Sequence, residues 1–113
     1  MKQGEIWLIN LEPTLGAEIK KTRPAIIVND DTLGRLPLKV IVPITEWKES
    51  YGVAPWMIKI EPDDQNNLNK VSAADCFQVR SISELRFVNQ IGIVKPDILD
   101  QIKDGLAKVF SIL

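Results

Sequence analysis

Short runs of apolar, β-branched and aromatic residues alternate with turn-forming residues along the chain up to residue 94. We expect strands at 5–11, 24–29, 38–45, 55–62, 71–80 and 87–94. The 24–29 run lacks polar alternation, which is typical of a strand buried on both faces. Pro24 fits this strand only as its first residue, because proline cannot donate to a ladder. Pro43 favours an edge or a bulge near the end of its own strand.

From Pro96 onward the apolar residues follow the three- and four-residue spacing of an amphipathic helix. They are Ile98, Leu99, Ile102, Leu106, Val109, Phe110 and Leu113. Asp97 and Asp100 complement the positive end of the helix dipole, and Gly105 costs roughly 1 kcal/mol against Ala. Five or six short strands followed by one helix predict a mainly β protein. We expect a strongly bent antiparallel sheet or half-open barrel, with the helix covering an opening, in a single domain over residues 1–113.

Composition limits the classes of partner and the compartment. The chain has 113 residues, a net charge of −1 and 26% charged residues, which is not the globally basic surface of a duplex-DNA binder. Any anion site must therefore be local. The single cysteine, Cys76, cannot form an internal disulfide. No apolar run is long enough for a signal-peptide core or a membrane span, so we expect a cytoplasmic protein with no membrane partner.

The absence of histidine excludes several classes of catalytic and metal site. It excludes Ser-His and Cys-His nucleophile pairs, imidazole bases and HExxH zinc sites. With only one cysteine as well, the sequence predicts neither a transition-metal site nor a cofactor. An enzyme built on this chain would use carboxylates, arginine, lysine, hydroxyls and backbone amides.

Positive charge is concentrated at the entry to one expected strand. Lys20, Lys21 and Arg23 occupy three of four positions immediately before Pro24 and a buried apolar run. A solvated loop is the simplest interpretation. The alternative is a site for a negatively charged ligand at the rim of a rigid sheet, where packing fixes the backbone that carries the cations.

Three segments, in this order, resemble the MazF/PemK (Kid-like) toxin endoribonucleases of bacterial toxin–antitoxin pairs. They are GEIWLINLEPTLGAEIKKTRPAIIVND at 4–30, VIVPIT at 40–45 and VSAADCFQVRSIS at 71–83. The resemblance implies an SH3-like small barrel with a C-terminal helix, usually a two-fold homodimer. It also implies metal-independent cleavage of single-stranded RNA at a short preferred sequence, which arrests growth. A small antitoxin blocks that activity by placing a flexible tail in the RNA groove, and contact with DNA arises only through the antitoxin complex.

The resemblance assigns catalytic roles to Arg23 and Thr45, which match the family's Arg-Pro and Pro-x-Thr motifs. An arginine fork matches two phosphate oxygens, and a threonine hydroxyl at a strand end can donate to a phosphate. A surface Arg paired with Glu18 or Asp30 is the structural alternative for Arg23. Glu18 matches the family's acidic loop position and is a candidate to orient Arg23 or to act as a base, with an exposed salt bridge as its equal alternative.

Further residues are candidates for RNA binding. Lys20 and Lys21 are phosphate contacts, and strand alternation puts Gln78 and Arg80 on one face, with Asp75 off that face unless a bulge intervenes. The polar stretch 61–67 is interpreted as a solvated turn.

Aromatic residues supply a second group of candidates. Trp47 and Tyr51, in the 46–55 loop, are candidates to stack on bases. Trp56 and Phe77 are expected in the core, with base stacking as the alternative for Phe77. Many family members carry an acid at the position of Phe77, and in some it has been proposed as the base. A carboxylate at this position therefore cannot remove the proton here: either Glu18 or another group does so, or catalysis relies mainly on Arg23 and Thr45, or this member cuts slowly.

Two other functions compete with the RNA-cleaving toxin. One is a catalytically silent member that binds RNA or a partner: the Phe77 departure keeps this alternative open, and the presence of Arg23, Thr45 and Arg80 argues against it. The other is a CcdB-like toxin that inhibits gyrase by protein contact. Such toxins depend on a Trp-Gly-Ile-like C-terminus, whereas this chain ends in FSIL.

Overall fold

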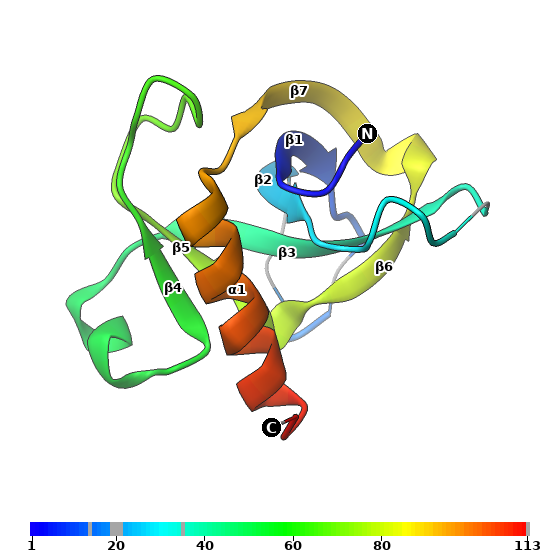
Figure 1. The fold of residues 1–113 in the computed structure, drawn as a ribbon. Helices are drawn as coiled ribbons and strands as arrows, with labels where there is room; N and C mark the ends of the chain where they lie inside the picture. Colours follow the sequence, from blue (N-terminus) through cyan, green and yellow to red (C-terminus); the bar gives the residue numbers. More distant parts are fainter. Residues whose placement is uncertain (14, 19–21, 35, 113) are drawn as a thin grey trace.

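The computed structural model describes residues 1–13, 15–18, 22–34 and 36–112. The strands are β1 (Glu5–Asn10), β2 (Thr22–Ile27), β3 (Leu38–Glu46), β4 (Met57–Ile60), β5 (Ser72–Asp75), β6 (Arg80–Ser83) and β7 (Phe87–Ile93). The helices are the α-helix α1 (Pro96–Val109) and the 3₁₀ turns η1 (Glu49–Val53), η2 (Cys76–Gln78) and η3 (Glu84–Arg86). The mainly β architecture with a C-terminal helix is confirmed (Figure 1), but the described chain has seven strands rather than five or six.

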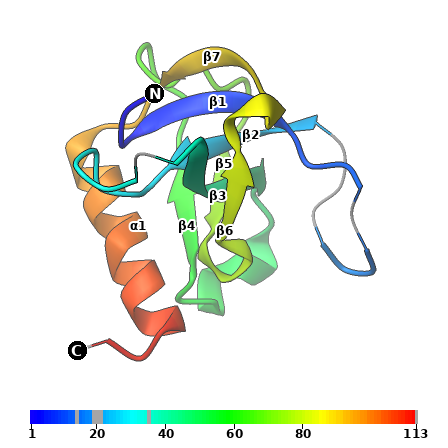
Figure 2. The ribbon, with the colours of Figure 1, turned by 90° about the vertical axis from the view of Figure 1, so that its right-hand side faces the viewer.

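The strands form one antiparallel sheet in the order β4-β5-β3-β2-β1-β7, with β6 paired to β3. β3 is the long central strand: it pairs with β6 over residues 38–41 and with β5 over residues 44–46. Because β6 lies on β3 while β7 returns to β1, the sheet curls into a half-open barrel. Figure 2 shows α1 on one side of this barrel and the described part of the β1–β2 connection extending from the other.

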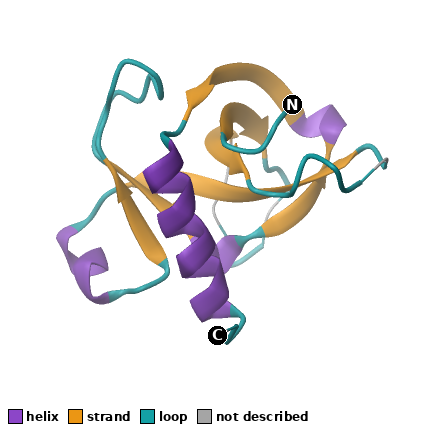
Figure 3. Ribbon diagram, in the orientation of Figure 1, coloured by secondary structure: helices purple, strands orange, loops and turns teal. Residues whose placement is uncertain are grey.

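The sheet is buried on both faces by two apolar clusters. The cluster beneath α1 contains Ile26, Val42, Ile44 and Ile102 among its members, so the helix closes this face. The cluster inside the curl contains Ile9, Leu11, Ala25, Ile27, Ile41 and Ile82. In Figure 3 the helix lies across the strands with η2 beside it. This double coverage explains why the central run of β2 shows no polar alternation.

Two prolines occupy positions that differ from the prediction. Pro24 is the third residue of β2 and not the first; it lies opposite Leu8 of β1, and the β2–β3 pairing begins one residue later, at Ala25. Pro43 lies in the central strand and not at an edge. It is tolerated because it falls between the stretch of β3 that pairs with β6 and the stretch that pairs with β5.

The single strand expected at 71–80 is wrong. The chain leaves β5 after Asp75, makes the 3₁₀ turn η2, and enters β6 at Arg80. The break lets the chain pair with one end of β3 through β5 and with the other end through β6. Alternation of faces does not continue through the turn, so sequence parity could not place the residues beyond it.

The helix ends earlier than the apolar spacing suggests. It stops at Val109, Phe110 is 57% exposed, and Leu113 lies outside the described residues. Gly105 is buried against the sheet: a Cβ built there would stand 2.9 Å from Cys76 Sγ. Glycine at this position therefore permits close packing of helix on turn. Within the described residues, no helix is long and apolar enough to cross a membrane.

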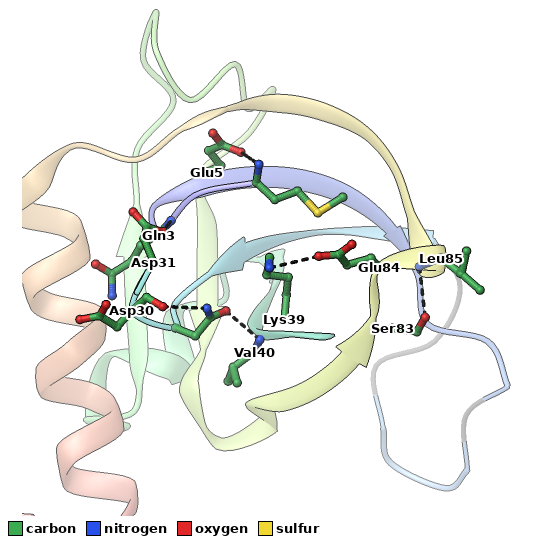
Figure 4. Close-up of polar contacts among 11 residues, drawn as sticks. Gln3, Glu5, Asp30, Asp31, Lys39, Val40, Ser83, Glu84 and Leu85 are labelled. Atoms are coloured by element: carbon green, nitrogen blue, oxygen red, sulfur yellow. Dashed lines mark hydrogen bonds and ion pairs between the residues drawn. The ribbon is translucent and has the colours of Figure 1, made fainter. Parts of the chain in front are cut away.

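Polar contacts tie the 29–37 loop and η3 to the central strand (Figure 4). The backbone N–H of Val40 donates to Asn29 Oδ1 at 3.0 Å. Lys39 Nζ lies 3.1 Å from Glu84 Oε1. These contacts fix the end of β3 that lies opposite the end carrying Thr45.

Candidate active site

Strand pairing brings the two principal candidates together. Ala25 lies opposite Pro43 at the end of the paired stretch of β2 and β3, and Arg23 and Thr45 each lie two residues beyond that pair on their own strands. Arg23 is also held from the other side, opposite Ile9 of β1. Arg23 and Thr45 are both partly buried and line the same hollow of about 430 Å³. A guanidinium and a hydroxyl from adjacent rigid strands therefore share one site.

The same hollow has a polar rim that the sequence analysis missed. Asn67, Asn69, Lys70 and Ser72 line it, together with Glu46, whose carboxylate lies 3.7 Å from Lys70 Nζ. The sequence signal for Glu46 was its place directly after the Pro-Ile-Thr strand end. The Asn67–Lys70 residues gave no usable signal, because a polar loop is ordinarily solvated.

That loop is built around buried Asn66. Asn66 Oδ1 accepts hydrogen bonds from the backbone N–H groups of Asp63 and Leu68, and its Nδ2 donates to the carbonyl of Glu61. Gly92 of β7 packs against it so closely that a Cβ there would lie 2.3 Å from the carbonyl oxygen of Gln65. The interpretation of 61–67 as a turn is confirmed, and most of its side chains are exposed. The exceptions are Asn66, which is buried and orders the turn, and Asn67, which lines the hollow.

Asp63 reinforces the loop electrostatically. Its carboxylate accepts the backbone N–H groups of Asn66 and Gln65, at 2.7 and 2.8 Å, and lies 3.8 Å from Lys95 Nζ. The N–H of Asn66 is the largest influence that holds the pKa of Asp63 below its usual range, with Gln65 and Lys95 adding to it.

A second hollow, of about 450 Å³, lies next along the sheet. Glu18, Phe77, Gln78 and Arg80 line it together with Leu11, Pro43 and Val79. Pro43 and Ile44, consecutive residues of β3, line one hollow each. Gln78 and Arg80 do share a site, although one comes from a turn and the other from a strand. Glu18 belongs to this group and not to the lining shared by Arg23 and Thr45.

The loop that carries Glu18 is anchored at its start. Arg86 Nη1 donates to the backbone carbonyls of Asn10 and Glu12, where β1 ends. Glu18 Oε1 accepts the backbone N–H of Leu15 at 2.6 Å, which closes a tight turn. Lys20 and Lys21, the predicted phosphate contacts, lie outside the described residues.

Asp75 organises the turn between the strands. It is buried, and it accepts the backbone N–H of Phe77 on Oδ1 at 3.1 Å and Gln78 Nε2 on Oδ2 at 3.0 Å. The expectation that strand parity separates Asp75 from Gln78 is wrong, because η2 rather than continuous strand joins them. The carboxylate thereby sets the orientation of the Gln78 amide.

Two aromatic residues expected in the core are at the surface. Phe77 is 66% exposed and Trp56 is 36% exposed, and their ring centroids lie 5.9 Å apart. Trp47 and Tyr51 form a separate edge-to-face pair with centroids 5.8 Å apart, and Lys59 Nζ lies 5.2 Å above the Trp47 ring. Their proposed base contact stays a prediction.

Cys76 and the acidic residues offer little further chemistry. Burial is the main influence that raises the pKa of the Cys76 thiol to about 12, and its Sγ lies 3.6 Å from the carbonyl oxygen of Ile102. Among the residues that the structure describes, no group of three or more cysteine, aspartate or glutamate side chains is arranged to hold a metal ion.

Comparison with known proteins gives concordant matches. Residues 2–110 match the family model described as PemK-like, MazF-like toxin of type II toxin–antitoxin system. The chain is 31% identical over 110 residues to Endoribonuclease MazF9 of Mycobacterium tuberculosis (strain ATCC 25618 / H37Rv), covering 94% of this chain and 92% of that protein. It is 28% identical over 113 residues to Endoribonuclease PemK of Escherichia coli, covering 98% and 83%. A solved endoribonuclease in complex with its cognate antitoxin, from Mycobacterial species, has the same fold: the TM-score is 0.79 at 16% identity, covering 100% of this chain and 97% of that one.

Proposed function

The chain belongs to the PemK-like, MazF-like toxin family of type II toxin–antitoxin systems, and on that premise we propose that its Arg23–Thr45 hollow is the active site of an endoribonuclease. The substrate is single-stranded RNA, cut without a metal ion at a preferred short sequence, with growth arrest as the consequence. The observation that carries the proposal is that Arg23 and Thr45, from neighbouring strands of a rigid sheet, line one hollow.

Cleavage of RNA without a metal ion has three chemical requirements. The 2′-oxygen of RNA loses its proton and attacks the adjacent phosphorus, the bond from phosphorus to the 5′-oxygen breaks, and the leaving oxygen takes up a proton. Negative charge grows on the phosphoryl oxygens between these events. Preorganised cationic donors often provide the largest part of the rate enhancement.

Arg23 stabilises that growing charge, because its planar fork donates to two phosphoryl oxygens at once. Thr45 donates its hydroxyl to the same phosphoryl group from the neighbouring strand. Both backbones are fixed by sheet pairing, so little reorganisation accompanies the reaction.

Two carboxylates are candidates for removing the 2′-proton. Glu46 lines the hollow with Arg23 and Thr45, and Glu18 lines the neighbouring hollow. Glu46→Gln and Glu18→Gln distinguish them: the variant that lacks the base loses about 10²- to 10⁴-fold in cleavage rate, and the other stays near wild type.

The proposal extends to RNA and protein partners. Lys20, Lys21, Gln78 and Arg80 contact the RNA backbone or bases on either side of the reacting phosphate, and Trp47 and Tyr51 supply outlying base contacts. A two-fold homodimer acts in the cytoplasm and is inhibited by a cognate antitoxin whose acidic tail enters the RNA groove. Contact with DNA arises only within the antitoxin complex.

Cleavage of a long mixed-sequence RNA in excess EDTA tests the function. The wild type should make discrete cuts that carry 5′-hydroxyl ends, and Arg23→Ala and Thr45→Val should lose them. Lys108→Ala is the matched control, because it removes one positive charge from the exposed last turn of α1. Intact RNA after incubation with folded wild-type protein on several sequences would refute the proposal, as would cutting that survives Arg23→Ala.

A further inference from the structure

An exposed aromatic pair stands at the edge of the second hollow. Phe77 lines that hollow and is 66% exposed, and its ring lies 5.9 Å from the Trp56 ring, tilted by 59°. Leaving a large apolar ring in water is unfavourable relative to burying it. The contact with Trp56 covers one part of Phe77 and leaves the rest available.

The backbone that carries the exposed Phe77 ring is anchored. The backbone N–H of Phe77 is bound by buried Asp75 at 3.1 Å. The preceding residue, Cys76, donates its N–H to the carbonyl of Trp56 at 3.0 Å, which ties the turn to the segment that carries the second ring. Gly105 of α1 packs directly against the Cys76 sulfur. Because the backbone of the turn is already ordered, little backbone entropy is lost when a ligand covers the ring.

The groups around the ring are those that bind a nucleotide. Gln78 and Arg80 line the same hollow, and the Gln78 amide is oriented by Asp75. Neutral amide and guanidinium groups can donate to base edges or phosphates beside a stacked ring. Pro43 lines this hollow, and Thr45, two residues along β3 and therefore on the same face of that strand, lines the Arg23–Thr45 hollow. An RNA chain bound at Thr45 can therefore extend along this face toward the aromatic pair.

We propose that Phe77, backed by Trp56 and held by Asp75, is a stacking platform for one unpaired RNA base next to the cleavage site, and that it contributes to sequence preference. The inference rests on the proposed RNA cleavage. A protein partner fits this position less well, because the ring is bordered by an amide, a guanidinium and the Glu18 carboxylate rather than by a continuous apolar surface.

The test measures binding to an uncleavable RNA of the mapped target sequence, carrying 2′-O-methyl groups and a fluorescein label, by fluorescence anisotropy. Phe77→Ala should raise the dissociation constant roughly 5- to 150-fold, the range expected for the loss of one stacked base. Phe77→Trp should retain affinity, whereas Phe77→Leu, apolar but without an aromatic face, should not. Phe110→Ala, which removes an exposed phenylalanine at the end of α1, is the matched control and should bind like wild type.

A second arm identifies the base. Abasic nucleotides are placed one at a time along the RNA, and at one position the wild type should lose the same affinity that Phe77→Ala loses. At that position Phe77→Ala should bind the abasic and normal RNAs equally, because the contact is already absent. Circular dichroism checks that each variant is folded.

The outcomes separate the two proposals. A wild type that neither binds nor cuts RNA refutes the function and the platform together. A wild type that cuts RNA while Phe77→Ala binds normally refutes the platform alone. Normal RNA binding by Phe77→Ala combined with weakened binding of the cognate antitoxin would also overturn base stacking, and would assign the ring to the protein partner.

Discussion

Replacing Gly105 by Ala should destabilise the fold, although helix propensity alone predicts the reverse. Gly105 lies inside α1, where Ala is favoured by about 1 kcal/mol. The added Cβ, however, would stand 2.9 Å from Cys76 Sγ and 3.3 Å from Ile58 Cδ1. Overpacking a core in this way costs about 1–3 kcal/mol. The net expectation is a loss of up to about 2 kcal/mol in the free energy of unfolding.

Urea denaturation of Gly105→Ala followed by circular dichroism measures this loss. Gly52→Ala in η1 is the matched control, because nothing lies within 4 Å of a Cβ there, and it should be near neutral. Adding Cys76→Ala to Gly105→Ala should recover part of the loss relative to Cys76→Ala alone, since the sulfur that the new methyl meets is gone. A Gly105→Ala protein more stable than the wild type would refute the packing argument.

Two further predictions concern titratable groups. Asp63→Asn should reduce the dependence of the free energy of unfolding on pH in acid. The pKa of Asp63 is held below its ordinary value of 3.8, so the stabilisation that its carboxylate provides is complete above that pH and is lost as pH falls through the folded pKa. Urea denaturation at several pH values between about 2 and 6 measures this. If the free energies of unfolding of the wild type and the variant changed equally with pH, the prediction would be wrong. Cys76, buried and with its pKa raised to about 12, should react with a thiol reagent at pH 8 only as fast as the protein opens. Rapid labelling of the folded protein would show that the sulfur is accessible.

The apolar pattern predicted the strands that lie wholly within one run. β1, β4 and β7 fall inside the predicted ranges, β3 runs one residue past its range, and α1 begins at the expected proline. The pattern failed where one run serves two partners. Residues 71–80 contain a 3₁₀ turn because the strands before and after it pair with opposite ends of β3. The local pattern of apolar residues does not show which distant strand a segment pairs with. The wrong core assignment of Phe77 follows from the same missed turn.

The candidate site was predictable only in part. Arg23 and Thr45 were selected from motif resemblance, and only strand register brings them to one hollow. The Asn67–Lys70 wall could not be found from sequence, because it depends on buried Asn66 and on the close approach of Gly92. Glu46 directly follows the Pro-Ile-Thr strand end, but this position alone does not distinguish a glutamate in a site from a solvated glutamate.

The single-turnover cleavage rate of Arg23→Ala, measured at saturating RNA in excess EDTA, tests the central claim most directly. Saturation separates the chemical step from binding, so a loss of rate reports transition-state stabilisation. We expect Arg23→Ala to cleave about 10²- to 10³-fold more slowly than the wild type, as when other preorganised donors are removed. A rate within a few-fold of the wild type would contradict the role of Arg23 and of the hollow that it shares with Thr45.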